Sequence, residues 1–128
     1  MIYLSAAQIL FIHARLIEET GGSHGVLDLG MLLSAIGRPQ SSFDDQELYA
    51  DLFSKAAALM ESLIRNHPFV DGNKRTGITA AGLFLRRNGY RLTAKNSDLL
   101  SITMKIAKSQ SDLEELIIWF RENSQPIK

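Results

Sequence analysis

The stretch LYADLFSKAAALMESLIR (residues 48–65) decides the fold that this sequence predicts. Its apolar residues recur at helical spacing on two faces, with Leu48, Leu52, Leu59 and Leu63 on one and Phe53, Ala57, Met60 and Ile64 on the other. A helix that is apolar over so wide an arc is buried by neighbouring elements. The sequence therefore predicts a central helix over residues 48–65, against which the rest of the chain packs.

The N-terminal segment predicts a first amphipathic helix. Ser5 and Gln8 form a capping box, and the apolar residues that follow them at helical spacing stop at Gly21. His13 lies on or beside the apolar face of this helix. We therefore interpret His13 as a packed histidine rather than a ligand.

Two signals lie between the first helix and the central one. A short helix is predicted over residues 29–36, with Asp28 as its N-cap and Gly37 as its terminator. The next stretch, GRPQSSF (residues 37–43), contains glycine and proline, which disfavour a helix. Residues 37–43 are therefore predicted to be extended or irregular.

The C-terminal half predicts three more helices. Residues 74–87 form a helix whose small side chains allow a neighbour to approach closely, and Gly89 ends it. Ser97 and Ser111 are the predicted N-caps of two last helices. Residues 90–92 are a candidate short strand without an obvious partner strand. The predicted fold class is all-α.

Composition bounds the class of protein. A chain of 128 residues with 45% hydrophobic and 22% charged residues predicts a single domain, residues 1–128, with a core of its own. The absence of cysteine removes disulfides, thiolate nucleophiles and cysteine zinc sites. The N-terminus lacks the basic region of a signal peptide, and no apolar run reaches the ~18 residues of a membrane span. These features predict a cytoplasmic protein.

Charge is balanced overall but uneven along the chain. The formal net charge is zero, which argues against a general binder of nucleic acids or membranes. Between Gly72 and Ser97, however, every charged residue is basic: Lys74, Arg75, Arg86, Arg87, Arg91 and Lys95. Most runs of basic residues lie on solvent-exposed surfaces without a specific role. A functional interpretation is therefore favoured only for the basic residues that adjoin a motif.

That motif is NHPFVDGNKRTG (residues 66–77), which connects the central helix to the helix over residues 74–87. Helix N-termini present free backbone N–H groups and a partial positive charge, and therefore bind anions such as phosphate. Gly72 permits a tight turn, and Asn73 can cap the helix or donate to a phosphate oxygen. Lys74 and Arg75 add cationic donors at an end of the helix where basic residues oppose the dipole. A local violation of this kind is typical of a functional site.

The residues before Gly72 add a base and a carboxylate. Pro68 ends the central helix, and Phe69 is the predicted anchor of the loop in the core. His67 is suited to accept a proton near neutral pH, and Asp71 can hold a divalent cation that neutralises phosphate charge. A base, a metal carboxylate and an anion site together suit phosphoryl or nucleotidyl transfer from a nucleoside triphosphate.

Another interpretation of the motif stays open on the residues alone. A lone His-Pro or Asn-Lys-Arg is common, and most such pieces are capped helix ends with solvated charges. The spacing of a Walker A loop is absent, as is a GxGxxG motif. The beginning of a calcium-binding loop at Asp71 is not continued by the later acidic residues that such a loop requires.

The motif resembles the signature of the Fic/Doc superfamily, in which His-Pro-Phe-x-Asp-Gly-Asn-Gly-Arg opens the active-site loop. Residues 67–75 read HPFVDGNKR, so that Lys74 replaces the second glycine, as in the Doc (death-on-curing) branch. The arginine that AMP-transferring members carry three residues later is Ile78 here. The stretch LFLRRNG (residues 83–89) and the chain length are also similar to Doc proteins.

The resemblance implies a compact Fic/Doc-type helical bundle and a toxin of a toxin–antitoxin pair. It implies phosphate transfer from ATP, with Mg²⁺, to a hydroxyl of a translation protein such as a threonine of elongation factor Tu. His67 would be the general base, and Asp71 would be either the magnesium-site carboxylate or a carboxylate that orients another group. Gly72 would form the turn, while Asn73, Lys74 and Arg75 would bind phosphate, the two cations acting in catalysis as well. Residues 37–43 correspond to a short β flap, to which a target segment can add as a strand.

The resemblance leaves two alternatives open. One is AMP transfer of the Fic type, and the other is a catalytically idle module that only binds an antitoxin. Self-restraining Fic proteins carry an inhibitory helix with the pattern Ser/Thr-x-x-x-Glu-Gly/Asn. Here the nearest match begins at Ser111 and is followed by Leu116, so we expect restraint by a separate antitoxin. Contact with nucleic acid is expected only through that antitoxin.

Overall fold

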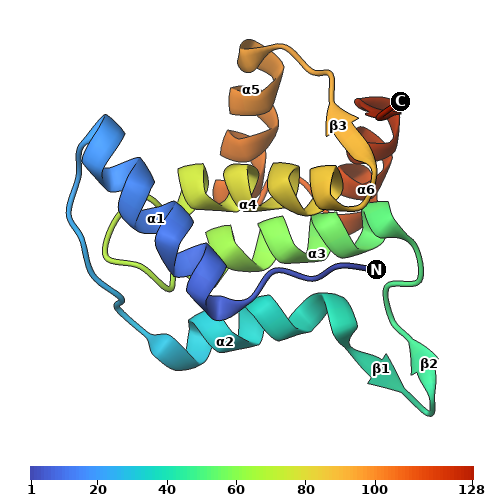
Figure 1. The fold of residues 1–128 in the computed structure, drawn as a ribbon, viewed down its shortest axis with the longest axis horizontal. Helices are drawn as coiled ribbons and strands as arrows, with labels where there is room; N and C mark the ends of the chain where they lie inside the picture. The colour runs from blue at the N-terminus through green and yellow to red at the C-terminus, as the bar shows by residue number, and fades with distance from the viewer.

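The fold is built around one buried helix, as the computed structural model of residues 1–128 shows (Figure 1). Helix α3 (Leu52–Arg65) lies in the middle and packs against α2 (Leu29–Gly37), α4 (Asn73–Arg87), α5 (Asn96–Ala107) and α6 (Leu113–Glu122). Helix α1 (Ala6–Thr20) packs mainly against α4. The prediction of an all-α fold with a central buried helix is confirmed. No helix combines the length and the apolar character that crossing a membrane requires.

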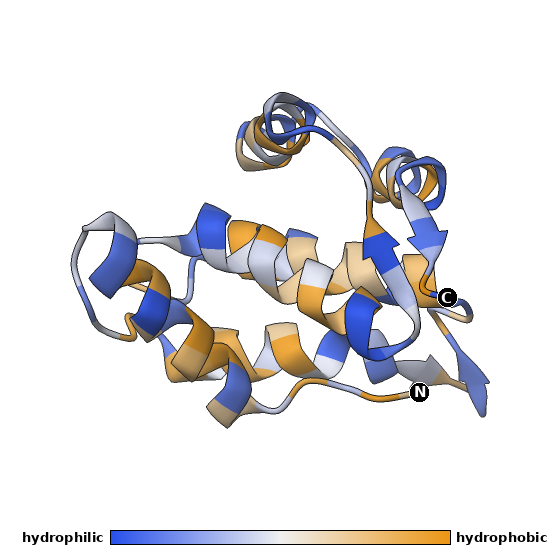
Figure 2. Ribbon diagram, turned by 45° about the horizontal axis from the view of Figure 1, so that its top comes forward, coloured by the Kyte–Doolittle hydropathy of each residue, from blue (hydrophilic) through white to orange (hydrophobic).

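The closest helix pair is α3 and α4, which run side by side (Figure 1). A Cβ atom at Gly77 would lie 2.8 Å from Ile64 Cγ1 and 3.3 Å from the carbonyl oxygen of Met60. Apolar residues of both helices belong to one buried core, and hydrophobic segments recur along the helices in the hydropathy colouring (Figure 2). The small residue at this position therefore allows the close approach that the sequence predicted.

The ends of the first helices follow from their caps. The capping box of Ser5 and Gln8 is present, and Gly21 caps the C-terminus of α1, as predicted. The central helix begins at Leu52 and not at Leu48, because the Asp51 side chain accepts a hydrogen bond from the Ser54 N–H. Leu48 lies outside the helix and is exposed, so its assignment to the buried face was wrong.

Gly37 is the last residue of helix α2 and does not act as a terminator beyond it. Gly37 keeps helical backbone angles and leads directly into a 3-10 turn, η1 (Arg38–Gln40), whose Pro39 is buried. The part of residues 37–43 predicted as irregular therefore begins with one more helical turn. A glycine stops a helix when it adopts a positive φ, and Gly37 has a φ of −77°.

The N-caps predicted for the last two helices were wrong. Lys95 precedes α5, while the side chain of Asp112 caps α6 by accepting from the Glu115 N–H. Ser111, predicted to be that cap, is buried beside it. Because adjacent Ser and Asp residues both have capping propensity, the sequence alone does not fix the boundary to one residue.

Two short antiparallel pairs complete the fold. Strand β1 (Ser42–Phe43) pairs with β2 (Gln46–Glu47), and β3 (Tyr90–Leu92) pairs with β4 (Ser124–Pro126). The strand predicted at residues 90–92 is therefore confirmed, and its partner lies near the end of the chain. The β1–β2 hairpin protrudes beside the N-terminal end of α3, whereas the loop that carries the motif follows its C-terminal end (Figure 1).

Candidate active site

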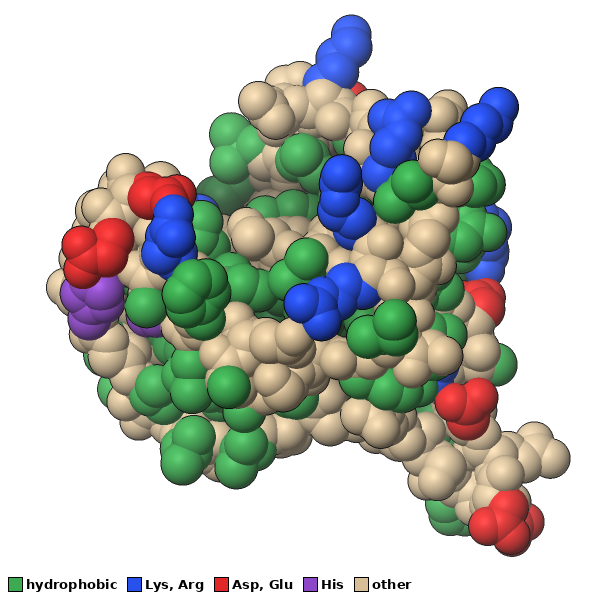
Figure 3. Space-filling model, viewed as in Figure 1, with side chains coloured by type: hydrophobic (Ala, Val, Ile, Leu, Met, Phe, Trp, Pro, Cys, Tyr) green, Lys and Arg blue, Asp and Glu red, His purple; other side chains and the backbone are tan.

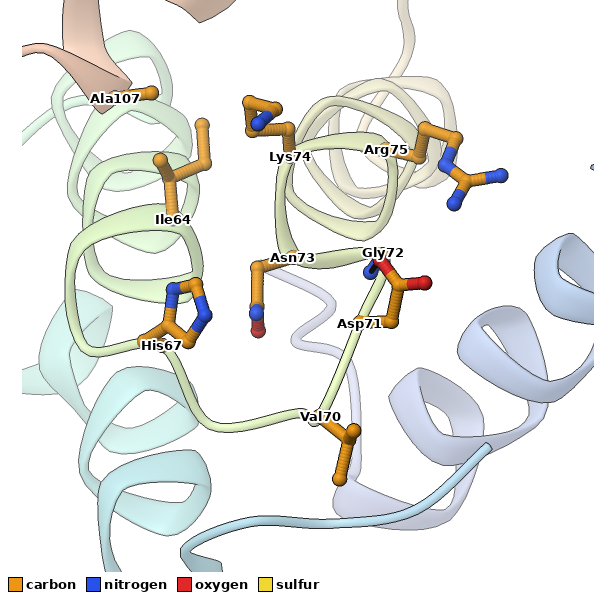
Figure 4. A pocket seen from close by; sticks show the side chains of 9 residues that line it. All are labelled: Ile64, His67, Val70, Asp71, Gly72, Asn73, Lys74, Arg75 and Ala107. Carbon is orange, nitrogen blue, oxygen red and sulfur yellow. Dashed lines mark hydrogen bonds between the residues drawn. The ribbon is translucent and has the colours of Figure 1, made fainter. Parts of the chain in front are cut away.

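The motif forms a loop between α3 and α4 and lines a pocket (Figure 4). The pocket has a volume of about 400 Å³, within the range of small-molecule sites. Its lining consists of Ile64, His67, Val70, Asp71, Gly72, Asn73, Lys74, Arg75 and Ala107. The structure thus brings every predicted site residue together around one cavity.

The candidate base is held in an unusual backbone conformation. His67 has a φ of +52°, in the left-handed region that non-glycine residues seldom occupy. Its side chain is exposed and makes no hydrogen bond within the chain, while the following Pro68 is buried. Strained backbone of this kind clusters at functional sites. Both ring nitrogens of His67 are therefore free to meet a ligand.

Asn73 has a structural task. Its side-chain oxygen accepts from the Phe69 N–H at 2.9 Å, and its side-chain nitrogen donates to the Phe69 carbonyl at 3.0 Å. Phe69 is completely buried, which confirms its prediction as the loop anchor. The Asn73 side chain does not cap α4, and both of its polar atoms are hydrogen-bonded to the Phe69 backbone, which closes the loop. Only its backbone N–H remains for a ligand.

The first turn of α4 offers several free donors. Gly72 adopts a φ of +79° and precedes the helix without any side-chain cap. The Thr76 N–H makes the first helical bond, to the Gly72 carbonyl at 2.9 Å. The backbone N–H groups of residues 73–75 therefore lack intrahelical partners and carry the positive end of the helix dipole. This end of α4 is suited to hold phosphate oxygens.

The two basic residues of the motif point in different directions (Figure 4). Lys74 is exposed on the pocket side and makes no ion pair or hydrogen bond. The Arg75 guanidinium extends toward α1, where it donates to the hydroxyl of Thr20 and to the Gly21 carbonyl. Lys74 is thus free to meet an anion, whereas Arg75 has to leave two acceptors before its head group can do so.

The ionised form of the Asp71 carboxyl is stabilised by its surroundings. Its Oδ1 accepts from the Gly72 N–H at 2.8 Å, and its Oδ2 accepts from the Ser23 N–H at 3.2 Å. These two backbone hydrogen bonds, with help from the positive charge of Arg75, hold the pKa of the Asp71 carboxyl below its usual value of 3.8.

The donor set around Asp71 fits Mg²⁺ better than a metal that needs a protein cage. No group of three or more metal-binding side chains exists in the chain. Mg²⁺ keeps several waters and commonly binds through one or two carboxylates together with substrate phosphates. Each Asp71 oxygen accepts one backbone hydrogen bond and retains a further lone pair. A single Asp71 beside a phosphate-binding helix end is compatible with that mode.

A segment that the sequence did not single out covers the loop. Residues 21–28 run antiparallel to it, with a bridge between Val26 and Phe69. The Leu27 N–H donates to the Pro68 carbonyl at 2.8 Å, and the Val70 N–H donates to the Gly25 carbonyl at 3.0 Å. These are backbone contacts, so the side-chain sequence carries little signal for them. The predicted flap, residues 37–43, lies instead at the other end of α3.

The rest of the basic run lies away from the pocket. Arg86 and Arg87 are in the last turn of α4, Arg91 is in β3 and Lys95 precedes α5. Lysine and arginine side chains gather over the upper right of the molecule, with few acidic ones among them (Figure 3). Because the pocket is at the other end of α4, only Lys74 and Arg75 of this basic run line it.

Comparisons with known proteins agree with the motif. The model of the Fic/DOC family matches residues 3–85, which include α1 to α3, the whole loop and most of α4. A protein of Mycolicibacterium smegmatis named Toxin Doc is 42% identical over 101 residues, covering 75% of each chain. A protein of Escherichia phage P1 named Protein kinase doc is 37% identical over 92 residues, covering 72% of each chain.

Proposed function

The chain belongs to the Fic/DOC family, and from that premise we propose that it is the toxin of a toxin–antitoxin pair. As its reaction we propose transfer of the γ-phosphate of ATP to a hydroxyl group of a translation protein, with a threonine of elongation factor Tu as the first candidate. The observation that carries the proposal is the pocket, which combines a free histidine, an ionised carboxylate and a helix N-terminus with free N–H groups. The name Toxin Doc of one relative supports the assignment as a toxin, and the name Protein kinase doc of the other supports phosphate transfer.

The nucleotide site uses the donors at the start of α4. Backbone N–H groups of residues 73–75 and the Lys74 ammonium hold phosphate oxygens, and Gly72 lets them approach the backbone. Asp71 would hold Mg²⁺ through its carboxylate. When bound, MgATP supplies the electrophilic phosphorus and an ADP leaving group whose charge the metal neutralises. Arg75 joins the phosphates after releasing Thr20 and Gly21.

His67 performs the proton transfer. One of its ring nitrogens accepts the proton of the acceptor hydroxyl, whose oxygen forms the new bond to the γ-phosphorus. The bond between that phosphorus and the bridging oxygen breaks, and the electron pair leaves with ADP. The free and exposed ring of His67 suits this role, because no internal hydrogen bond competes for either nitrogen.

Lys74 favours phosphate transfer over AMP transfer. A lysine at this position adds a side chain where AMP-transferring members have glycine, and this crowds the pose that brings the α-phosphorus to the base. Its ammonium is a compact charge suited to a terminal phosphate. Ile78 also lacks the charge of the later arginine that holds the triphosphate in the other pose. Both changes favour a nucleotide with its γ-phosphate nearest His67.

The protein acceptor docks, in this proposal, along residues 21–28. One edge of this segment pairs with the active-site loop on either side of Val26. The Val26 N–H makes no hydrogen bond within the chain, and the Val26 and Leu27 side chains are 41% and 64% exposed. An extended target segment can therefore add to the second edge through backbone hydrogen bonds. This places an acceptor hydroxyl next to the loop that carries His67.

The antitoxin acts in trans in this proposal. The nearest match to an internal inhibitory motif begins at Ser111, which is buried, and its Leu116 belongs to the core. That segment is therefore an ordinary part of α6 and its cap, and a separate protein has to restrain the toxin.

The test is the mass added to purified elongation factor Tu by the protein with ATP and magnesium. We expect an increase of about 80 Da, the mass of a phosphoryl group, and no increase with a His67→Ala variant. An increment of about 329 Da would assign AMP transfer instead, while leaving the role of His67 intact. No modification of this or any other protein of a susceptible lysate would support the idle binding module.

A further inference from the structure

A histidine of α1 lies directly beneath the active-site loop. His13 is only 4% exposed, and its ring stacks on Phe69 with centroids 3.8 Å apart and planes 6° from parallel. Its Nε2 lies 2.8 Å from the backbone carbonyl oxygen of Asp71. A Cβ atom on Gly72 would come within 3.6 Å of the same ring. His13 thus touches the residues on which the loop conformation depends.

The acceptor in this contact fixes the protonation of the ring. A carbonyl oxygen only accepts hydrogen bonds, so the hydrogen between the two atoms belongs to Nε2 of His13. A buried phenylalanine would provide the same stacking without this bond. A histidine at this position therefore indicates a role in addition to packing.

We propose that His13 is a positioning residue for the magnesium carboxylate. Its Nε2–H holds the carbonyl of Asp71, while the Ser23 and Gly72 N–H groups hold the two carboxylate oxygens. The backbone and the side chain of Asp71 are thereby fixed from both ends, with the carboxylate beside the start of α4. The inference rests on the proposed role of Asp71 in binding Mg²⁺, and it extends the site into α1.

A face and an edge of the His13 ring therefore have separate roles. Stacking on Phe69 stabilises the loop, and the Nε2–H orients Asp71. Residues that orient a metal ligand typically contribute about 10–100-fold in metal affinity or activity. Removing the donor while keeping the ring should therefore weaken magnesium binding far more than it weakens the fold.

The experiment compares His13→Phe, which keeps the ring, with His13→Gln, which keeps a donor at about the reach of Nε2. Magnesium is titrated calorimetrically in the presence of a non-hydrolysable ATP analogue, and thermal stability is measured in parallel. We expect His13→Phe to bind magnesium at least about 10-fold more weakly than the wild type and His13→Gln to recover most of that loss. Tyr90→Phe, which changes a ring at the far end of α4, is the control and should bind normally.

Nuclear magnetic resonance of the wild type supplies a readout that needs no activity. The ring nitrogen shifts of His13 should identify Nε2 as the protonated atom, with an Nε2–H that exchanges slowly.

A Nδ1–H tautomer, or a folded His13→Phe that binds magnesium like the wild type, would overturn the proposal. So would normal magnesium binding by Asp71→Ala. If His13→Phe fails to fold, the proposal is tested by the magnesium titration of His13→Gln and by the tautomer of His13 in the wild type. If the wild type binds magnesium but transfers no phosphate, the proposed function is wrong, whereas the positioning role of His13 is not affected.

Discussion

At the scale of single residues, the side chains of the site are either free of internal hydrogen bonds or hydrogen-bonded within the chain. His67 and Lys74 make no hydrogen bond in the chain, whereas Asp71, Asn73 and His13 use their polar atoms to shape the loop. Free groups can meet a substrate without first breaking internal bonds. Hydrogen-bonded groups keep the loop in one conformation. Substitution of a free side chain should therefore affect mainly the reaction, and substitution of a hydrogen-bonded one should also affect the loop.

Replacing His67 tests its proposed role as the base and the strain that it carries. We expect His67→Asn to lower phosphate transfer by ~10²–10⁴-fold, because an amide cannot accept the hydroxyl proton. Its stability should equal or exceed that of the wild type, since asparagine tolerates the left-handed backbone at this position. Transfer assays and urea unfolding measure the two effects. Wild-type transfer by the variant would remove His67 from the mechanism.

Lys74→Gly tests the choice of transferred group. The variant should lose phosphate transfer, because the ammonium that holds the terminal phosphate is absent. It should not gain AMP transfer, because Ile78 still leaves the triphosphate poorly held in the other pose. Mass spectrometry of the acceptor, with Lys105→Gln on α5 as a control for general loss of positive charge, gives the answer. Undiminished phosphate transfer by Lys74→Gly would contradict the assignment.

Asp71 contributes a pH dependence of stability whose sign follows from its pKa. The folded-state pKa lies below the ordinary value of 3.8 because of two backbone hydrogen bonds to the carboxylate. The stabilisation is therefore complete above pH 3.8 and is lost as the pH falls through the lower folded-state pKa. The stability difference between wild type and Asp71→Asn should shrink as the solution is acidified. Unfolding by urea at several acidic pH values checks this, and a difference independent of pH would contradict it.

At the scale of elements, the active-site loop depends on how closely α4 approaches α3. The C-terminus of α3 and the N-terminus of α4 are the two ends of the loop, so the separation of these helices sets its span. Gly77 lies one turn into α4 and faces Ile64 in the last turn of α3. A larger residue there pushes apart the two ends that position His67 and Asp71.

Gly77→Ala and Gly82→Ala form a matched pair on α4. At Gly77 the new Cβ would lie 2.8 Å from Ile64 Cγ1 and 3.3 Å from a backbone oxygen, and overpacking of this kind costs about 1–3 kcal/mol. At Gly82 the nearest atom, Leu92 Cδ1, would be 3.5 Å away, so alanine should stabilise α4 by up to ~1 kcal/mol. Thermal unfolding should thus move in opposite directions for the two variants. Equal shifts would mean that α3 and α4 adjust to the added methyl group.

At the scale of the whole molecule, α1 and residues 21–28 form a wall on one side of the loop. His13, Thr20 and Ser23 reach the loop or α4 from this wall through the contacts described above. The pocket therefore depends on elements separated in sequence by some fifty residues, as the Ser23–Asp71 contact illustrates. An antitoxin that covers this wall could reach both the docking edge and the catalytic loop.

Control in trans predicts the behaviour of the isolated protein in cells. Expression of the wild type without an antitoxin should arrest growth where the translation machinery is susceptible, and His67→Ala should relieve the arrest. Co-expression of the cognate antitoxin should restore growth, because the proposed restraint comes from a separate protein. Growth curves after induction measure all three cases. Unimpaired growth with abundant wild-type protein would contradict the proposed toxin activity.

The sequence by itself determined the helices, the central position of α3 and the set of residues that share the active-site loop. Periodic apolar residues identify a buried face because helices have a fixed geometry, and a continuous motif keeps its members close whatever the fold. The capping box of Ser5 and the anchor role of Phe69 could be predicted for the same reason, since each depends on neighbours within a few residues.

Only the tertiary structure decided how the members of the loop divide their tasks. Asn73 turns inward because the Phe69 backbone needs two partners, and Arg75 turns toward α1 because Gly21 and Thr20 offer acceptors there. The pairing of residues 21–28 with the loop, the strand opposite residues 90–92 and the contact of His13 with Asp71 are backbone or long-range contacts. Backbone groups are the same in every residue, so their pairing leaves little trace in the sequence and follows only from the packed fold.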